Sequence, residues 1–301
     1  MYIFAVLVVV LAFAAVIATI IAMYSYANAY LYNSNNSNNT EPHVHFMTSN
    51  ETAHFFAEDR DRYVRNMSPL DLHARNVKTP AEYINKIKDT AISFTDDEKD
   101  LLRQCVKDAD IYLRNEVFSE LEYGKHLNGG AIADIKWIFA NTYTKYELDV
   151  IKENEQGLPH TREDIILLSK NVLKYDALNL TNTLIHEKIH IYQRYNPAIF
   201  DTIIKEMGLK ELDKRVFKQA KYIRSNPDTN NKIYYYPETG KDADAYDIEN
   251  VMVCLYRNDK PNSINDVIQR NYAAEHPYEK IAYEIGENFN KNNKNKYINI
   301  K

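Results

Sequence analysis

The chain has 301 residues with a net charge of −5, and 45% of them are apolar; it contains 24 tyrosines but only 7 glycines. Few glycines beside many Lys, Glu and Asn residues favour a helix-rich globular protein over a β-sandwich. The negative charge gives no reason to expect nucleic acid as a partner, and no phosphate-binding glycine loop, dinucleotide fingerprint or nucleophile elbow is present.

Residues 1–24 form an apolar segment without a charged side chain. The run Ile3–Ala22 is as long as a bilayer-spanning helix needs, about 20 residues. It contains no Lys or Arg and is longer than the apolar region of a signal peptide, so we predict a single transmembrane anchor and membrane attachment. Because Ala27-Asn28-Ala29 fits a cleavage pattern, a secreted form is the alternative.

The rest of the chain divides by composition into a linker, a domain and a tail. Residues 25–54 include the polar run Asn33–Thr40, which cannot bury enough apolar surface to order itself, so they are predicted to be a flexible linker. Residues 55–290 suffice for one sizeable domain. Residues 291–301, rich in Lys and Asn, are predicted to be a disordered tail.

The domain is predicted to have an α+β fold with many helices and a small sheet. Helices are expected over 55–75 and 80–93 and from Asp96 through Val106, where acidic residues fill the first turn. The apolar runs 135–140 and 164–169 predict strands. They precede a histidine-bearing helix, so a sheet edge should lie over that helix, where an extended peptide could add as a strand.

The segment around His186-Glu187-x-x-His190 carries the strongest functional signal. Residues four apart share one face of a helix, so both imidazoles can bind one metal ion, with zinc favoured. Glu187 can then accept a proton from a metal-activated water as general base. The alternative is a helix with two ordinary histidines.

The helix that carries this motif has predicted ends. It is expected to begin near Asn179, Thr181 or Asn182, whose side chains can cap it, and to end at Asn196-Pro197. An extended motif with a third histidine is excluded, because Gln193 and Asn196 stand where Gly and His would be needed.

A third protein ligand must therefore come from further along the chain. Pro277 suits the first position of a helix, on which Glu279 borders an apolar face. Glu279 is the preferred candidate; Glu284, Glu275 and His276 are the alternatives. Because Glu284 lies about 140° around the helix from Glu279, the two should not serve the same metal.

Four other residues each allow two interpretations. Tyr283, one turn after Glu279, is a candidate donor to a developing oxyanion, or else a packed aromatic residue. His160 could contact substrate or simply be an exposed loop residue. Cys105 and Cys254 could form a disulfide in an oxidising compartment, and would otherwise be two thiols.

The His186-Glu187-x-x-His190 motif, followed at a distance by a helix-borne glutamate, resembles the gluzincin branch of the zincin metallopeptidases. Pro277-Tyr278-Glu279-x-x-Ala282-Tyr283 is similar to the third-ligand segment of several such proteins. The runs Leu158–Thr161 and Leu184–Arg194 also look like uncharacterised membrane-anchored proteins of large DNA viruses, which implies a virion or host membrane.

This resemblance implies a zincin-like fold and zinc-dependent hydrolysis of peptide bonds in a peptide or protein substrate. His186, His190 and Glu279 would be the ligands of Zn²⁺, with Glu187 as the base. Two features depart from the pattern: the segment between His190 and Glu279 is long, and Tyr283 stands where thermolysin-like members have Asp. The alternatives are a membrane-anchored structural or adhesion protein with an inactive zincin fold, and hydrolysis of a non-peptide amide.

Overall fold

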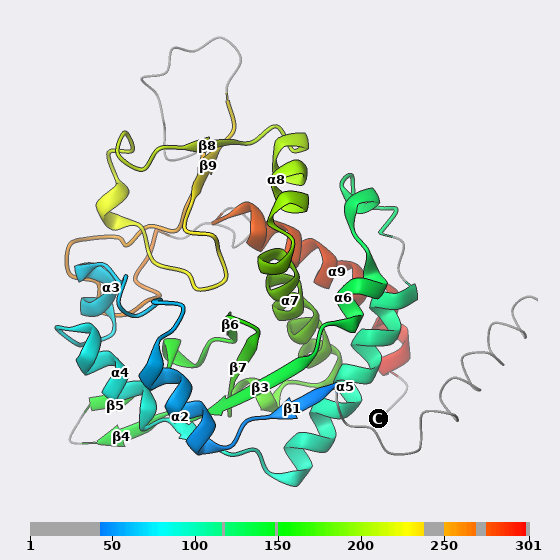
Figure 1. Cartoon of the computed structure of the whole chain (residues 1–301), viewed down its shortest axis with the longest axis horizontal. Helices are drawn as coiled ribbons and strands as arrows, with labels where there is room; N and C mark the ends of the chain where they lie inside the picture. Colours follow the sequence, from blue (N-terminus) through cyan, green and yellow to red (C-terminus); the bar gives the residue numbers. More distant parts are fainter. Residues whose placement is uncertain (1–42, 116–117, 148–149, 238–249, 269–274, 299–301) are drawn as a thin grey trace, which may run out of the picture. The chain divides into compact units, whose positions relative to one another are not determined.

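A mixed sheet organises the folded part of the chain (Figure 1). The computed structural model describes residues 43–115, 118–147, 150–237, 250–268 and 275–298. The strand order is β1 (Val44–Phe46), β3 (Trp137–Thr142), β7 (Ile165–Ser169) and β6 (His160–Arg162), and β2 (Ala91–Ile92) also pairs with β3. β1, β3 and β7 are parallel, whereas β6 runs antiparallel along the edge. The predicted strands over 135–140 and 164–169 are confirmed as β3 and β7.

Helices cover both faces of this sheet, because alternate residues of β3 and β7 point to opposite sides. On one face, Phe139 and Ile166 pack in the main core with α5 (Asp96–Asn115), α6 (Gly129–Asp134), α7 (Ala177–Tyr195), α8 (Pro197–Glu206) and α9 (Pro277–Ile298). On the other face, Ala140 and Leu167 pack with α2 (Ser49–Glu58), α3 (Pro69–Ala74) and α4 (Pro80–Lys88). The α+β fold is thus confirmed.

Two smaller sheets and four short 3₁₀ turns are the other regular elements of the described residues. The strands are β4 (Lys145–Glu147) with β5 (Val150–Lys152), and β8 (Lys210–Leu212) with β9 (Ile233–Tyr235) and β10 (Val251–Met252); the turns are η1 (Gly124–His126), η2 (Glu155–Gly157), η3 (Val172–Lys174) and η4 (Ala220–Tyr222). The β8–β10 sheet has its own small apolar core. It lies beyond the end of α7 in Figure 1.

The folded unit begins earlier than the predicted domain boundary at residue 55. His43 accepts a hydrogen bond at its carbonyl from the Trp137 amide (2.7 Å), and its ring pairs with Asp110 (3.0 Å). Thr48 and Glu51 then form a reciprocal capping box that starts α2. Residues 43–54 are therefore folded, and the predicted linker over 25–54 is wrong for this part.

Two predicted helices and the predicted tail also differ from the structure. Residues 55–75 do not form one helix, because Asp59 adopts a left-handed conformation and ends α2; α3 then begins at Pro69. The segment 80–93 is helical only to Lys88. The predicted tail is helical as far as Ile298, since no proline follows Pro277 in α9.

The motif helix, α7, begins at Ala177 rather than near Asn179. Its N-cap is Asp176, whose carboxylate accepts the Asn179 backbone N–H (2.9 Å). It ends at Asn196 before Pro197, as predicted. A proline at the first position of α8 cannot continue the preceding helix, so the chain turns there.

Two further predictions concern the cysteines and the membrane anchor. Both cysteines are buried free thiols, so Cys105 and Cys254 do not pair. The predicted anchor, residues 1–24, lies outside the described residues. Among the helices that the structure does describe, none combines the length and hydrophobicity of a bilayer-spanning segment.

A buried lysine ties α7 to the end of α6. Lys188 Nζ donates to the carbonyls of Ala133 (3.1 Å) and Ile135 (2.7 Å), lies 3.3 Å from an Asp110 oxygen and sits over the Trp137 ring. We expect Lys188→Met to lower the free energy of unfolding by about 3 kcal/mol, because buried acceptors lose their donor. Urea denaturation of the full-length chain measures this change.

The exposed Lys205 at the end of α8 provides the control. Lys205→Met removes the same charge without uncovering a buried acceptor, so it should change the unfolding free energy by no more than about 0.5 kcal/mol. Equal effects of the two substitutions would contradict the proposed role of Lys188.

Candidate metal centre

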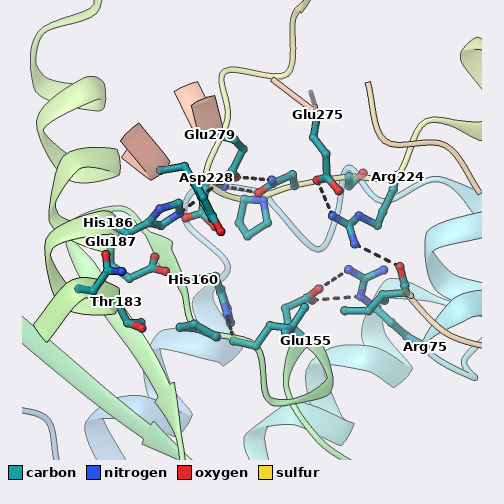
Figure 2. Close-up of a pocket in the computed structure, with 18 of the residues that line it drawn as sticks. Arg75, Glu155, His160, Thr183, His186, Glu187, Arg224, Asp228, Glu275 and Glu279 are labelled. Atoms are coloured by element: carbon teal, nitrogen blue, oxygen red, sulfur yellow. Dashed lines mark hydrogen bonds and ion pairs between the residues drawn. The ribbon is translucent and has the colours of Figure 1, made fainter. Parts of the chain in front are cut away.

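Two imidazoles and a carboxylate converge between α7 and α9 (Figure 2). His186 Nε2 and His190 Nε2 are 3.0 Å apart. Glu279 Oε2 lies 3.3 Å from the His186 nitrogen and 3.5 Å from the His190 nitrogen. Within the described part of the chain, this is the group of three His, Cys, Asp or Glu side chains whose ligand atoms come this close.

The spacing of these three atoms fits a tetrahedral zinc ion. Ligands about 2.05 Å from zinc at tetrahedral angles lie about 3.3 Å from one another. The observed separations of 3.0, 3.3 and 3.5 Å bracket this value. A circle through the three atoms has a radius of about 1.9 Å, so a single point about 2 Å from each of them exists. Two nitrogens and one carboxylate oxygen are also a donor set that zinc accepts.

Gln193 determines which ring nitrogen of neutral His190 carries the proton. The Gln193 amide nitrogen donates to the Tyr278 carbonyl (3.0 Å), which leaves the amide oxygen to face His190 Nδ1 (2.8 Å). Because that oxygen can only accept, Nδ1 carries the single proton of the neutral ring, which leaves Nε2 as the nitrogen that can bind a metal beside His186 and Glu279. A hydrogen bond of this kind commonly orients a metal-binding histidine.

The charge states of Glu279 and His190 depend on each other. Burial opposes ionisation of Glu279, but the two imidazoles hold the pKa of this carboxyl well below its usual range. Burial alone would lower the pKa of His190, whereas Glu279 and Asp228 raise it to about 9. The Glu279 carboxylate and the His190 imidazole therefore favour each other's charged form, and a divalent cation can replace the proton on that imidazole.

Glu187 lies in the wall of the same cavity without being one of the three converging groups. Its side chain is 2% exposed, and its Oε2 has no hydrogen-bond partner among the described residues. Burial and the nearby charge of Asp228 raise the pKa of this carboxyl well above its ordinary value. A buried carboxyl group with one unpaired oxygen beside the cluster is placed to exchange a proton.

The three alternative ligands point elsewhere. Glu284 accepts from the Tyr123 hydroxyl (2.6 Å) and pairs with Lys280. Glu275 pairs with Arg224 (2.7 Å). His276 is held by Asn230 (3.0 Å) and by the Tyr278 backbone N–H (3.0 Å). Of the carboxylates considered from the sequence, only Glu279 reaches the histidines.

Tyr283 and His160 both line the cavity, and in each case the structure disfavours one of the two predicted alternatives. Tyr283 is 45% exposed and meets the His186 ring edge-on (centroids 6.4 Å apart), so it is not a core aromatic residue and stays a candidate donor to an oxyanion. His160 is buried on β6 and bonded to Asn154 and to the Leu158 carbonyl, so it is not an exposed loop residue. Burial lowers its pKa.

The cavity has a volume of about 280 Å³. Figure 2 shows His186, Glu187 and Thr183 on one side of it and two arginine–glutamate pairs on the other. Arg75 donates to Glu155 (Nε to Oε1, 3.0 Å), and this pairing, against the effect of burial, lowers the pKa of Glu155 to about 2. Arg75 and Arg224 are each paired with a glutamate, so neither is a free cationic group.

The outer edge of β6, where an added peptide strand is predicted, is occupied at Thr161 by side chains of the protein itself. The N–H and C=O of Thr161 point away from β7, as those of alternate residues in an antiparallel pair do. The N–H donates to Asp228 Oδ1 (2.7 Å) and the carbonyl accepts from Arg194 (3.0 Å). Arg194 also binds the Glu163 carbonyl (3.2 Å).

Sequence reasoning missed Gln193, Asn226 and Asp228. Gln193 was considered only as a residue that breaks the three-histidine motif. Asn226 and Asp228 belong to a loop, Ser225-Asn226-Pro227-Asp228, whose composition indicates a turn and nothing more. Only the tertiary structure brings that loop against the cluster.

Comparison with known proteins yielded no match to any family model, curated protein or solved structure.

Proposed function

We propose that this protein is a zinc-dependent peptidase of the zincin type. His186, His190 and Glu279 would hold the metal, and Glu187 would act as general base. One observation carries the proposal: the three donor atoms are spaced as tetrahedral zinc requires, and the buried carboxyl of Glu187 lies beside them on the helix that carries the two histidines. The order of elements, a sheet with an antiparallel edge followed by the motif helix and a glutamate helix, supports it further.

Zinc held by His186, His190 and Glu279 would supply Lewis acidity, which polarises a carbonyl and lets a water lose a proton near neutral pH. The remaining steps belong to side chains of this protein. Glu187 accepts that proton at its unpaired Oε2 and returns it to the departing amine. Gln193 keeps the His190 lone pair directed at the cluster, and the paired arginines keep the opposite wall in place. In this proposal, residues 1–24 attach the enzyme to a membrane.

Metal removal tests the proposal. We expect the purified full-length chain to contain a single zinc ion by elemental analysis and to cleave members of a fluorogenic peptide library. Chelation should abolish cleavage, and added zinc should restore it, because no protein group replaces the Lewis acid.

A double variant, His186→Ala with His190→Ala, is the matched control, and it should contain no zinc. A wild-type chain without zinc would refute the metal centre. Zinc binding without cleavage of any peptide would instead favour a structural or adhesion protein with an inactive zincin fold.

A further inference from the structure

The two carboxylate oxygens of Glu279 have different partners. Oε2 faces both histidines, at 3.3 and 3.5 Å. Oε1 points to the other side and accepts a hydrogen bond of 2.6 Å from the Asn226 amide nitrogen. Glu279 is 8% exposed, so few other donors can reach it. The bond from Asn226 therefore determines which oxygen is presented to the histidines.

The Asn226 amide cannot reverse its orientation. Its oxygen accepts the backbone N–H of Asp228 (2.8 Å), and this donor requires an acceptor. The nitrogen is then the only end that can face Glu279. This arrangement parallels that of Gln193, whose amide is held by the Tyr278 carbonyl and faces His190.

The segment Ser225–Asp228 is itself anchored at both ends. Ser225 donates from its backbone N–H and its hydroxyl to the buried carboxylate of Asp71 (3.0 and 2.7 Å). At the other end, Asp228 accepts from the Thr161 hydroxyl (2.6 Å), and Arg194 donates to the Pro227 carbonyl (2.7 Å). Asn226 thus projects from a segment that α3, β6 and α7 hold in place.

We infer that Asn226 is a positioning residue for the metal's third ligand. By occupying Oε1, it makes Glu279 bind through Oε2 alone, which keeps a coordination position open for water or substrate. Without this bond the carboxylate can rotate and bind through both oxygens, or turn away from the histidines. The inference rests on the proposed zinc site, and partners of metal ligands typically contribute about 10–100-fold in metal affinity.

The test compares zinc affinity in full-length variants by competition with a chromophoric chelator. Asn226→Ala removes the donor to Glu279 and the turn oxygen. Asn226→Asp keeps the turn oxygen but removes the donor. Asn258→Ala is the matched control, because the Asn258 side chain accepts a backbone N–H two residues on (Lys260, 2.7 Å) in the same kind of turn, at an exposed site.

We expect both Asn226 variants to bind zinc about 10–100-fold more weakly than wild type, and Asn258→Ala to bind it equally well. The visible absorption of the cobalt-substituted protein should weaken in the Asn226 variants, because a carboxylate that binds through both oxygens raises the coordination number. Their zinc-free unfolding midpoints should stay close to that of Asn258→Ala.

Two results would overturn the inference while leaving the zinc site intact. One is wild-type zinc affinity in both Asn226 variants. The other is a loss of zinc-free stability, relative to Asn258→Ala, large enough to explain the weaker binding, because Asn226 would then serve the fold and not the ligand. Failure of the wild-type chain to bind zinc would instead refute the proposed function itself.

Discussion

Glu187→Gln is expected to reduce peptide hydrolysis by about 10²–10⁴-fold, the usual contribution of a general base. Glutamine has nearly the same shape as glutamate but cannot accept a proton at neutral pH. Because Glu187 Oε2 has no hydrogen-bond partner among the described residues, the substitution breaks no existing contact of that atom. The rate of cleavage and the zinc content, measured on one preparation, separate chemistry from metal binding.

Zinc content should be unchanged in Glu187→Gln, since Glu187 is not one of the three converging groups. Glu187→Asp is a second informative variant. It keeps the carboxylate but shortens the side chain by one methylene, so its activity should lie between those of wild type and Glu187→Gln. Wild-type cleavage by Glu187→Gln would show that another group is the base. Loss of zinc would show that Glu187 is a ligand.

Glu279→Ala is expected to weaken zinc binding by at least about 100-fold, because it leaves two protein ligands where a catalytic zinc site needs three. Glu284→Ala is the matched control on the same helix. Glu284 binds Tyr123 and Lys280 instead of the cluster, so its removal should leave zinc affinity unchanged. Chelator competition measures both variants.

Circular dichroism of the zinc-free proteins shows whether each variant keeps its helices. The assignment of the third ligand fails if Glu279→Ala is folded and binds zinc as wild type does. It also fails if the two substitutions weaken binding equally, because a general disturbance of α9 would then explain both.

Local patterns predicted the parts of the site that lie within single elements. His186 and His190 are one helical turn apart, so their convergence required only that α7 form. Pro277 marked the start of α9, and apolar runs marked β3 and β7. Glu279 could be proposed because it stands near a helix start on the side that faces the core.

Such local patterns could not predict contacts between segments that are distant in the sequence. β1 is a three-residue strand that is stable only because β3 pairs with it, so nothing in its own sequence separates it from a linker. The capping box of Thr48 and Glu51 was a local signal that could have placed the start of α2. Asn226 and Asp228 reach the cluster through bonds to segments far away in the chain, which periodicity cannot reveal.

The covered edge of β6 has a consequence for selectivity. Peptidases that hold substrates as an added strand grip main-chain atoms, which every sequence shares, and they can therefore tolerate many sequences. Here Asp228 and Arg194 already occupy those atoms of Thr161. If the chain is the peptidase proposed above, a substrate cannot be held through the main-chain atoms of Thr161, and we expect its selectivity to depend more strongly on substrate side chains.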